Sequence, residues 1–520
     1  MQLRWLLLII PVFVLLHVPP AHADVLLKNG HIRSGQVTKI DDEGVEITNE
    51  YRSGKMVSQC PRKEIESING LTYEDFQRLF QRHHAFINND TEKTFKKVLK
   101  ESKKSIKHKT NIDINIKFDP ELISKKDLKK YLEKQLNNKE SQKELEKQNR
   151  FWTYLGVVDP KSDFKNDLIN SYADSIEGLY SKDDKKLYYI MDGEDDKLSL
   201  YNPFSPNIVI IHELIHALQD QKGYLKDEDQ TKLISDDMAA AQKAVIEGGA
   251  TYVSYSILND ALQEKARIYG SKDLKGKNNK DIHLDYESVM LESSSLVYNN
   301  LKNSTGDELI YELMIFPYVS GGKFMKYAYD NGGWDEIDKV YTHPPVSTEQ
   351  IIHPEKYFIF RDDPVPMPSR DYSFLLGQGG KLVTDGVFGE FGLYTYIGRF
   401  QNRLYARTAS AGWGNDHYQL FSRKGDLFFI SESAWDSRQD GEEFLQTMKK
   451  VLEKRFYPLT WEARKGDILK GKCREQVLLL ASRGNEVLWV ESSASDGAML
   501  AKVVAQFEAE QGGSGTAGTQ

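Results

Sequence analysis

The sequence predicts an α+β multidomain protein, with a small N-terminal β-barrel, a mainly helical central domain and a C-terminal α+β domain. Its 520 residues exceed the length of one ordinary domain, and 40% of them are apolar, which is enough to form buried cores. Short β-rich runs with glycine turns open the chain and helical patterns dominate its centre. Strand-like runs return after Pro364, Pro366 and Pro368.

The N-terminus has the three parts of a secretory signal peptide. Arg4 supplies a basic start, residues 5–16 are apolar, and Ala21-His22-Ala23 is a cleavage site. The apolar run ends before reaching the roughly 20 residues that a membrane span needs. We therefore expect an exported protein, periplasmic or extracellular, cleaved after Ala23, with no transmembrane segment afterwards and with envelope proteins as candidate partners.

The charge and the cysteines add further limits. A formal net charge of −8 argues against nucleic acid as the main partner. Cys60 and Cys473 are the two cysteines of the chain. A disulfide between them requires Cα atoms within about 7 Å of each other, so a bond and two free buried thiols both stay open.

Residues 24–70 resemble an SH3-like barrel, because turn dipeptides such as Asn29-Gly30 and Ser53-Gly54 separate short β-rich runs. Nothing in them indicates a ligand. Lys and Glu spaced four apart predict exposed helices over 71–150. After residue 370 we expect strands in FGEFGLYTYIGRF, GDLFFISES and NEVLWVESS, with helices near 441–455 and 496–510. The predicted parts are the signal peptide 1–23, the barrel 24–70, the charged helices 71–150, the central domain 151–365, the C-terminal domain 370–510 and a flexible tail 511–520.

The stretch IVIIHELIHALQDQ, residues 208–221, carries the chemistry. On a helix, His212 and His216 lie on one face, one turn apart. That spacing lets two imidazoles reach one tetrahedral zinc at about 2.0–2.1 Å. Glu213 adjoins the first ligand, so it can reach a zinc-bound water without being a ligand itself. We expect Asn207 to cap the helix. The opposite face is a buried apolar stripe of Ile208, Ile211, Ile215 and Leu218.

A catalytic zinc keeps three protein ligands and leaves its fourth position to water. The metzincin pattern is excluded, because Gln219 and Lys222 stand where it requires glycine and histidine. Glu247 lies on a small, apolar helical stretch within 235–258, where a lone carboxylate is costly unless paired or bound to metal. Glu247 is therefore the expected third ligand. The glycines that follow it predict a close approach to the motif helix. The alternatives are Asp220, Asp236, Asp237 and Glu292.

HELIHALQD followed by a helical EGGAT resembles the gluzincins, the thermolysin-like class of zinc metallopeptidases, over residues 208–255. The resemblance implies a zincin-like catalytic domain over 151–365 and a Zn²⁺ cofactor held by His212, His216 and Glu247. It further implies hydrolysis of peptide or protein substrates by a zinc-bound water with Glu213 as general base. The pattern that continues through PPVSTEQIIHPEKYF resembles exported bacterial proteins of unassigned substrate.

Two neighbouring segments have roles in similar enzymes. Residues 178–191 predict a hairpin whose edge strand would bind substrate backbone, with a purely structural hairpin equally open. Thr342-His343-Pro344-Pro345 resembles the His-Pro segment of CAAX-prenyl-protease-like gluzincins, although this chain has Gln350 where those usually have arginine. His343 or His353 would then donate to the oxyanion, and a structural role for each is the alternative.

Other interpretations stay open at this point. Asp220 would either support a histidine ligand or cap the helix, and Asp416 and His417 fit a satisfied turn better than a metal site. The whole chain could instead be an envelope-associated binding or assembly protein with a non-catalytic zincin domain. Glu213 argues against that function, since a structural metal site needs no base. Hydrolysis of a non-peptide bond is a third interpretation.

Overall fold

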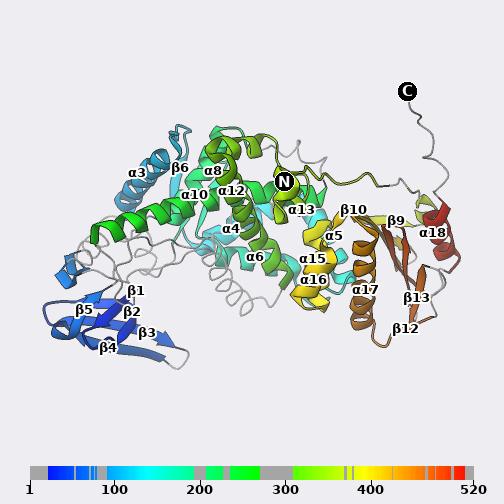
Figure 1. Ribbon diagram of the computed structural model, residues 1–520, viewed down its shortest axis with the longest axis horizontal. Helices are drawn as coiled ribbons and strands as arrows, with labels where there is room; N and C mark the ends of the chain where they lie inside the picture. The colour runs from blue at the N-terminus through cyan, green and yellow to red at the C-terminus, as the bar shows by residue number, and fades with distance from the viewer. Residues whose placement is uncertain are drawn as a thin grey trace.

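The protein is described here by a computed structural model, in which three parts follow one another along the longest axis (Figure 1). The N-terminal sheet lies at one end, helices fill the centre, and the C-terminal sheet lies at the other end. The α+β class is confirmed. The described residues are 22–51, 54–68, 72–74, 76–78, 91–191, 207–225, 235–269, 308–367, 370, 372–376, 380–423, 425–462, 467–474, 476–493 and 497–509. Residues 1–21 of the predicted signal peptide, Glu292 and the tail 511–520 lie outside them.

The N-terminal sheet is antiparallel, with the strand order β4-β3-β2-β1-β5. Its elements are β1 His22–Leu27, β2 Ile32–Ile40, β3 Gly44–Tyr51, β4 Gly54–Pro61, the short helix η1 Arg62–Glu64 and β5 Ile65–Ile68. The predicted hairpins are confirmed, and Val25, Val45, Cys60 and Ile68 lie in the core. Cleavage after Ala23 would leave Asp24 as the first residue of β1. Cys60 and Cys473 are both buried free thiols.

The central part combines helices with a small sheet of order β6-β8-β7. Its elements are α3 Thr91–Thr110, β6 Asp119–Ile123, α4 Lys125–Leu136, α5 Lys139–Tyr154, α6 Phe164–Ser175, β7 Gly178–Ser181, β8 Lys186–Ile190, α8 Ile208–Gln221, α10 Asp236–Tyr269, α12 Glu308–Thr342, α13 Thr348–Ile352 and α14 Glu355–Phe358. The segment predicted as charged helices therefore also contains β6, which pairs in parallel with β8. Alongside its charged residues, α3 buries Phe95, Val98 and Leu99 in one core cluster with α8.

Glycines allow α10 and α12 to cross with their backbones in contact. A Cβ on Gly248 would lie 2.1 Å from the carbonyl carbon of Gly321, and one on Gly321 would lie 2.0 Å from the Ala244 oxygen. A Cβ on Gly249 would lie 1.8 Å from the Tyr341 hydroxyl. The prediction that these glycines allow a close approach of the motif helix was wrong, because the helix that packs against them is α12. This packing fixes the position of Glu247, which precedes them on α10.

Gly248→Ala is expected to destabilise the protein by about 1–3 kcal/mol, because the added methyl group forces α10 away from α12. Chemical denaturation of the two proteins measures this difference. Gly497→Ala is the matched control, since a Cβ there meets nothing within 4 Å. Equal stability of Gly248→Ala and the wild type would show that the helix crossing is looser than described.

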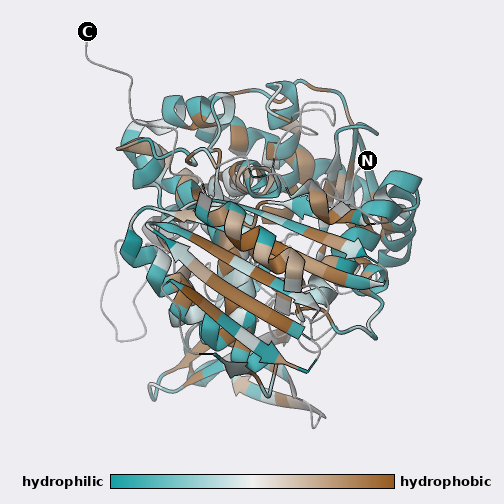
Figure 2. Cartoon of the chain, turned by 90° about the vertical axis from the view of Figure 1, so that its right-hand side faces the viewer, coloured by the Kyte–Doolittle hydropathy of each residue, from teal (hydrophilic) through white to brown (hydrophobic). Residues whose placement is uncertain are grey.

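The C-terminal part is an antiparallel sheet of order β12-β13-β14-β15-β11-β10-β9, seen face-on in Figure 2. Its elements are η2 Ser373–Leu376, β9 Lys381–Gly386, α15 Gly389–Phe400, α16 Arg403–Ser410, β10 Trp413–Arg423, β11 Asp426–Trp435, α17 Arg438–Arg455, β12 Thr460–Trp461, β13 Ile468–Cys473, β14 Gln476–Arg483, β15 Glu486–Ser493 and α18 Gly497–Ala509. Successive strand residues point to opposite faces. Leu478 and Leu480 therefore join the core cluster that contains α15 and α17, while Val477 and Leu479 pack with α18.

One element of this part was predicted wrongly. Residues 388–400 were expected to form a strand, but α15 is a helix. The carboxylate of Asp416 accepts the backbone N–H groups of Phe388 and Gly389, each at 2.9 Å, and so satisfies donors of the first turn. Asp416 also accepts the Trp413 indole N–H, which agrees with the expected structural role. The strands at β11 and β15 and the helices α17 and α18 are confirmed.

No helix in the described part of the chain has both the length and the apolar character needed to cross a bilayer.

Candidate metal centre

The motif helix α8 is capped at its N-terminus and buried along most of its length. The Asn207 side chain accepts the Ile210 N–H at 2.9 Å, so the predicted cap is confirmed. All residues from Ile208 to Gln219 are buried, and not only the predicted apolar stripe. Because the surrounding side chains pack against them, the two histidines have few available orientations. A metal site requires ligands held in this way.

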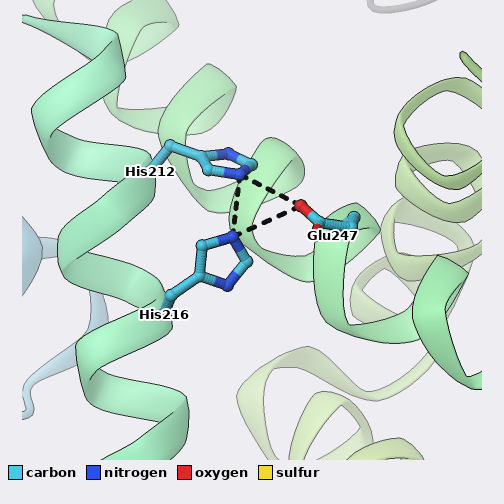
Figure 3. A group of neighbouring side chains, drawn as sticks. All are labelled: His212, His216 and Glu247. Atoms are coloured by element: carbon cyan, nitrogen blue, oxygen red, sulfur yellow. Dashed lines mark hydrogen bonds and ion pairs between the residues drawn. The ribbon is translucent and has the colours of Figure 1, made fainter. Parts of the chain in front are cut away.

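Three side chains from α8 and α10 converge on one point (Figure 3). The Nε2 atoms of His212 and His216 are 3.0 Å apart, and each is 3.3 Å from Glu247 Oε2. Four ligands at 2.0–2.1 Å in a tetrahedron are about 3.3–3.4 Å from one another. The three atoms therefore have nearly the spacing of three corners of a zinc tetrahedron. Glu247, and not Asp220, Asp236 or Asp237, completes this group.

The protonation states of Glu247, His212 and His216 favour binding of a cation between them. Burial raises the pKa of Glu247, but the two imidazoles outweigh it and hold the pKa well below its usual range. Burial lowers the pKa of His212 to about 4. For His216 burial acts in the same direction, yet the charge of Glu247 raises its pKa to about 9. Without a metal, a proton on His216 thus balances the carboxylate, and a bound zinc ion would replace that proton.

Gln219 fixes the orientation of the second histidine. Its Nε2 donates to the Ile246 carbonyl at 2.8 Å and to the Tyr341 hydroxyl at 2.9 Å, so its Oε1 faces His216. His216 Nδ1 lies 2.7 Å from that oxygen and must be the donor. The lone pair of Nε2 is then available to a metal. The sequence interpretation missed this role, although Gln219 stands three residues after His216 on the same helix face.

Gln219→Leu is expected to weaken zinc affinity about 10–100-fold, because His216 loses the partner that sets its tautomer. Competition against a chromophoric chelator measures this change. Gln219→Glu keeps an acceptor at Oε1 and should lose less. If the leucine variant binds zinc as the wild type does, the histidine is oriented by its packing alone.

Glu213 lies beside the ligand group with one oxygen held and one available. The Tyr180 backbone N–H donates to its Oε2 at 2.6 Å, while its buried Oε1 has no hydrogen-bond partner among the described residues. Burial raises the pKa of Glu213 to about 8 and the charge of Glu247 acts in the same direction, against His216 and the Tyr180 N–H. A carboxylate with a raised pKa and an open oxygen is suited to taking up a proton.

The predicted hairpin is confirmed as β7 and β8, with β7 at the edge of the sheet formed by the described strands. It packs directly on α8, because a Cβ on Gly178 would lie 2.9 Å from Glu213 Cγ. Asp220 accepts the Tyr180 hydroxyl at 2.6 Å and also pairs with Lys185. Asp220 therefore holds the hairpin against α8, a role that neither sequence alternative included.

The structure does not bring His343 or His353 to this group. His343 is exposed, and its Nδ1 lies 3.1 Å from Thr342 Oγ1. His353 Nε2 lies 3.0 Å from Glu390 Oε1 on α15. Among the described residues, neither contacts the zinc-ligand candidates, so the oxyanion role predicted for one of them has no support here.

A second acidic group is already filled by a lysine. Glu349, Asp362 and Asp436 offer oxygens within 4.8 Å of one another. Lys356 Nζ lies 2.7, 2.8 and 2.6 Å from them. The ammonium stands where a metal ion would, so the group is an ion-pair network.

Asp237 lies between the central helices and the C-terminal domain, where Thr348 donates to it through its backbone N–H and its hydroxyl. Burial raises its pKa from 3.8 to about 8, with Asp416 and Glu390 acting in the same direction against the Thr348 bonds. The folded state thus keeps a proton that the unfolded chain releases above about pH 4. The contribution of Asp237 to the free energy of unfolding should be complete below that pH and should be lost as the pH rises toward 8.

Asp237→Asn is expected to flatten this dependence, since the amide does not titrate and keeps an acceptor for Thr348. Thermal unfolding at pH 5, 6.5 and 8 checks the prediction. The variant should approach or exceed the wild type at pH 8. Parallel curves for the two proteins would assign the dependence to other groups.

Comparison with known protein families gives a match to the C-terminal part of the chain, and the function of the matched family is unknown. A family model described as "Domain of unknown function (DUF8575)" matches residues 379–502, from just before β9 into α18. No curated protein and no solved structure matches the chain. The matched segment lies outside the helices that carry His212, His216 and Glu247.

Proposed function

We propose that this protein is an exported zinc-dependent metallopeptidase of gluzincin type, acting in the periplasm or outside the cell. The observation that carries the proposal is the spacing of 3.0–3.3 Å between two imidazole nitrogens and a carboxylate oxygen, with a buried Glu213 beside them. A site that only holds a metal for stability needs no such carboxylate. Export rests on the N-terminal sequence pattern.

In this mechanism His212, His216 and Glu247 would hold zinc. A bound zinc ion would supply a water of pKa about 7 and a Lewis acid for the substrate carbonyl. Glu213 takes the proton of the attacking water on its open Oε1 and passes it to the leaving amine. The Tyr180 N–H keeps the Glu213 carboxylate in one orientation during both transfers.

The finer fold assignments belong to the same proposal. The convergence of α8 and α10 on one ligand set supports a zincin-like central domain. The meander of β1 to β4, with β5 returning to β1, supports an SH3-like N-terminal barrel. We assign that barrel a docking or packing role, as its residues indicate no chemistry.

Zinc content and casein hydrolysis, measured on the mature chain 24–520, test the proposal. We expect about one zinc per chain and casein cleavage that phenanthroline stops and added zinc restores. Zinc without cleavage of casein or of a peptide library would favour an envelope binding or assembly protein. Absence of zinc binding would overturn the metal centre.

A further inference from the structure

The two most exposed large apolar side chains of the described residues belong to the C-terminal part. Tyr457, just after α17, is 83% exposed, and Leu404, at the start of α16, is 72% exposed. Tyr405, beside Leu404, is 56% exposed. A single exposed apolar side chain is common on a protein surface, but three of them on two packed helices need a physical reason.

Contacts between α16 and α17, which lie side by side in Figure 1, join these side chains into one surface. Lys450 Nζ lies 5.6 Å from the centre of the Tyr405 ring. Lys454, one turn further along α17, donates from Nζ to the Phe400 carbonyl at 2.5 Å, just before α16 begins. Tyr457 follows three residues later. We call this surface the basic aromatic patch and define it by Leu404, Tyr405, Arg407, Lys450, Lys454 and Tyr457.

The charge of the patch is opposite to that of the whole chain. Its three cations are exposed, whereas the chain has a formal net charge of −8. Two carboxylates adjoin the patch and both are engaged: Glu312 pairs with Arg403 at its edge, and Glu453 accepts the Trp461 indole N–H at 2.8 Å. Charges are screened beyond about 8 Å at physiological salt, so a surface in contact with the patch interacts mainly with its cations.

The combination of side chains matches the boundary layer of a lipid bilayer. Tyrosine rings are enriched at the level of the headgroups, where one end of the ring is apolar and the hydroxyl stays wet. Lysine and arginine have long apolar stems and charged ends that reach lipid phosphates. A leucine flanked by such residues can enter the upper part of the acyl chains, as on helices that lie in a membrane surface.

We propose that the basic aromatic patch docks this protein on a bilayer that contains anionic phospholipids. Leu404, Tyr405 and Tyr457 enter the boundary between headgroups and acyl chains, and Arg407, Lys450 and Lys454 contact the phosphates. Binding through so few apolar side chains is reversible. The proposal does not depend on zinc or on peptidase activity, and it places the protein where membrane-associated chains are its nearest substrates or partners.

Co-sedimentation of the chain 24–520 with vesicles tests the proposal. At low salt, binding to vesicles of about 70% phosphatidylcholine and 30% phosphatidylglycerol should be at least about tenfold stronger than binding to pure phosphatidylcholine, and about 0.5 M NaCl should remove most of the difference. Leu404→Ser combined with Tyr457→Ser should weaken binding about tenfold. Lys450→Glu combined with Lys454→Glu should weaken it about 30-fold.

Matched variants elsewhere on the surface serve as controls. Ile359→Ser removes an equally prominent apolar side chain, 70% exposed, that is followed by Asp362 and Asp363. Lys93→Glu combined with Lys100→Glu reverses two exposed charges on α3. Both controls should bind the vesicles as the wild type does. All of these side chains are exposed, so the thermal midpoints of the variants should equal that of the wild type.

A label on the patch distinguishes insertion from adsorption. Cys60 and Cys473 are buried, so Leu404→Cys provides an accessible thiol for an environment-sensitive fluorophore. Its emission should shift to the blue with the phosphatidylglycerol vesicles, and the emission from labelled Ile359→Cys should not shift.

Four results would overturn the proposal: no vesicle binding at low salt, equal binding to both lipid compositions, unchanged binding of the patch variants, or an unshifted label at position 404. If gel filtration instead shows a dimer that the patch variants dissociate, the patch binds a second copy of this chain and not a membrane. None of these outcomes bears on the proposed metal centre, so the two proposals fail separately.

Discussion

Glu213→Gln is expected to lower kcat/KM for peptide hydrolysis about 10³-fold while about one zinc per chain stays bound. Glutamine has the same shape and can still accept the Tyr180 N–H, but it cannot take a proton from water and return it to the amine. Because this substitution leaves the three proposed zinc ligands unchanged, it tests the proton transfer separately from metal binding. The measurement is kcat/KM on one peptide, with zinc content determined on the same samples.

Protein stability provides an internal check on this variant. Burying the Glu213 carboxyl in its charged form is unfavourable, as its raised pKa indicates. The amide should therefore leave the thermal midpoint unchanged or raise it. Glu133→Gln, on the exposed surface of α4, is the matched control for activity. If Glu213→Gln retains a tenth or more of the wild-type activity with zinc bound, Glu213 is not the base.

The predicted placements of side chains that the structure reproduces rest on local geometry or on strict energetic costs, while metal binding itself stays a prediction. The pairing of His212 with His216 follows from helical spacing alone, and the Asn207 cap follows from its place before the apolar run. Glu247 came from another part of the chain, yet burying a lone carboxylate on an apolar helix costs so much that a partner had to exist. The structure supplies two imidazoles as that partner.

The predictions that failed depend on contacts distant in sequence. Residues 388–400 have a strand-like pattern, and what stabilises their first helical turn is Asp416, on a strand that follows. The glycines after Glu247 predict a close approach of another helix, but the sequence does not identify that helix. In the structure it is α12, which contacts them through Gly321 and Tyr341. No local pattern showed that Tyr180 would give its N–H to Glu213, because that bond requires the hairpin to be docked.

Glu247→Ala is expected to weaken zinc binding by about 10²–10³-fold, since a zinc site shares a binding free energy of about 10–16 kcal/mol among its ligands. The variant also removes the negative charge that raises the pKa of His216. Both imidazoles would then be neutral, and two neutral ligands without a carboxylate are not enough to hold a divalent cation tightly in a buried site. Chelator competition gives the affinity, and metal analysis after gel filtration gives the stoichiometry.

Asp237→Asn is the matched control for this loss, because Asp237 is also a buried carboxylate on α10 but lies among Thr348, Asp416 and Glu390. It should keep the affinity and stoichiometry of the wild type. If Glu247→Ala still binds zinc tightly, the third ligand is another residue, and Glu292, outside the described residues, becomes the first to replace. If zinc is lost from Asp237→Asn instead, the ion binds between the two domains and the pair of histidines on α8 is a packing feature.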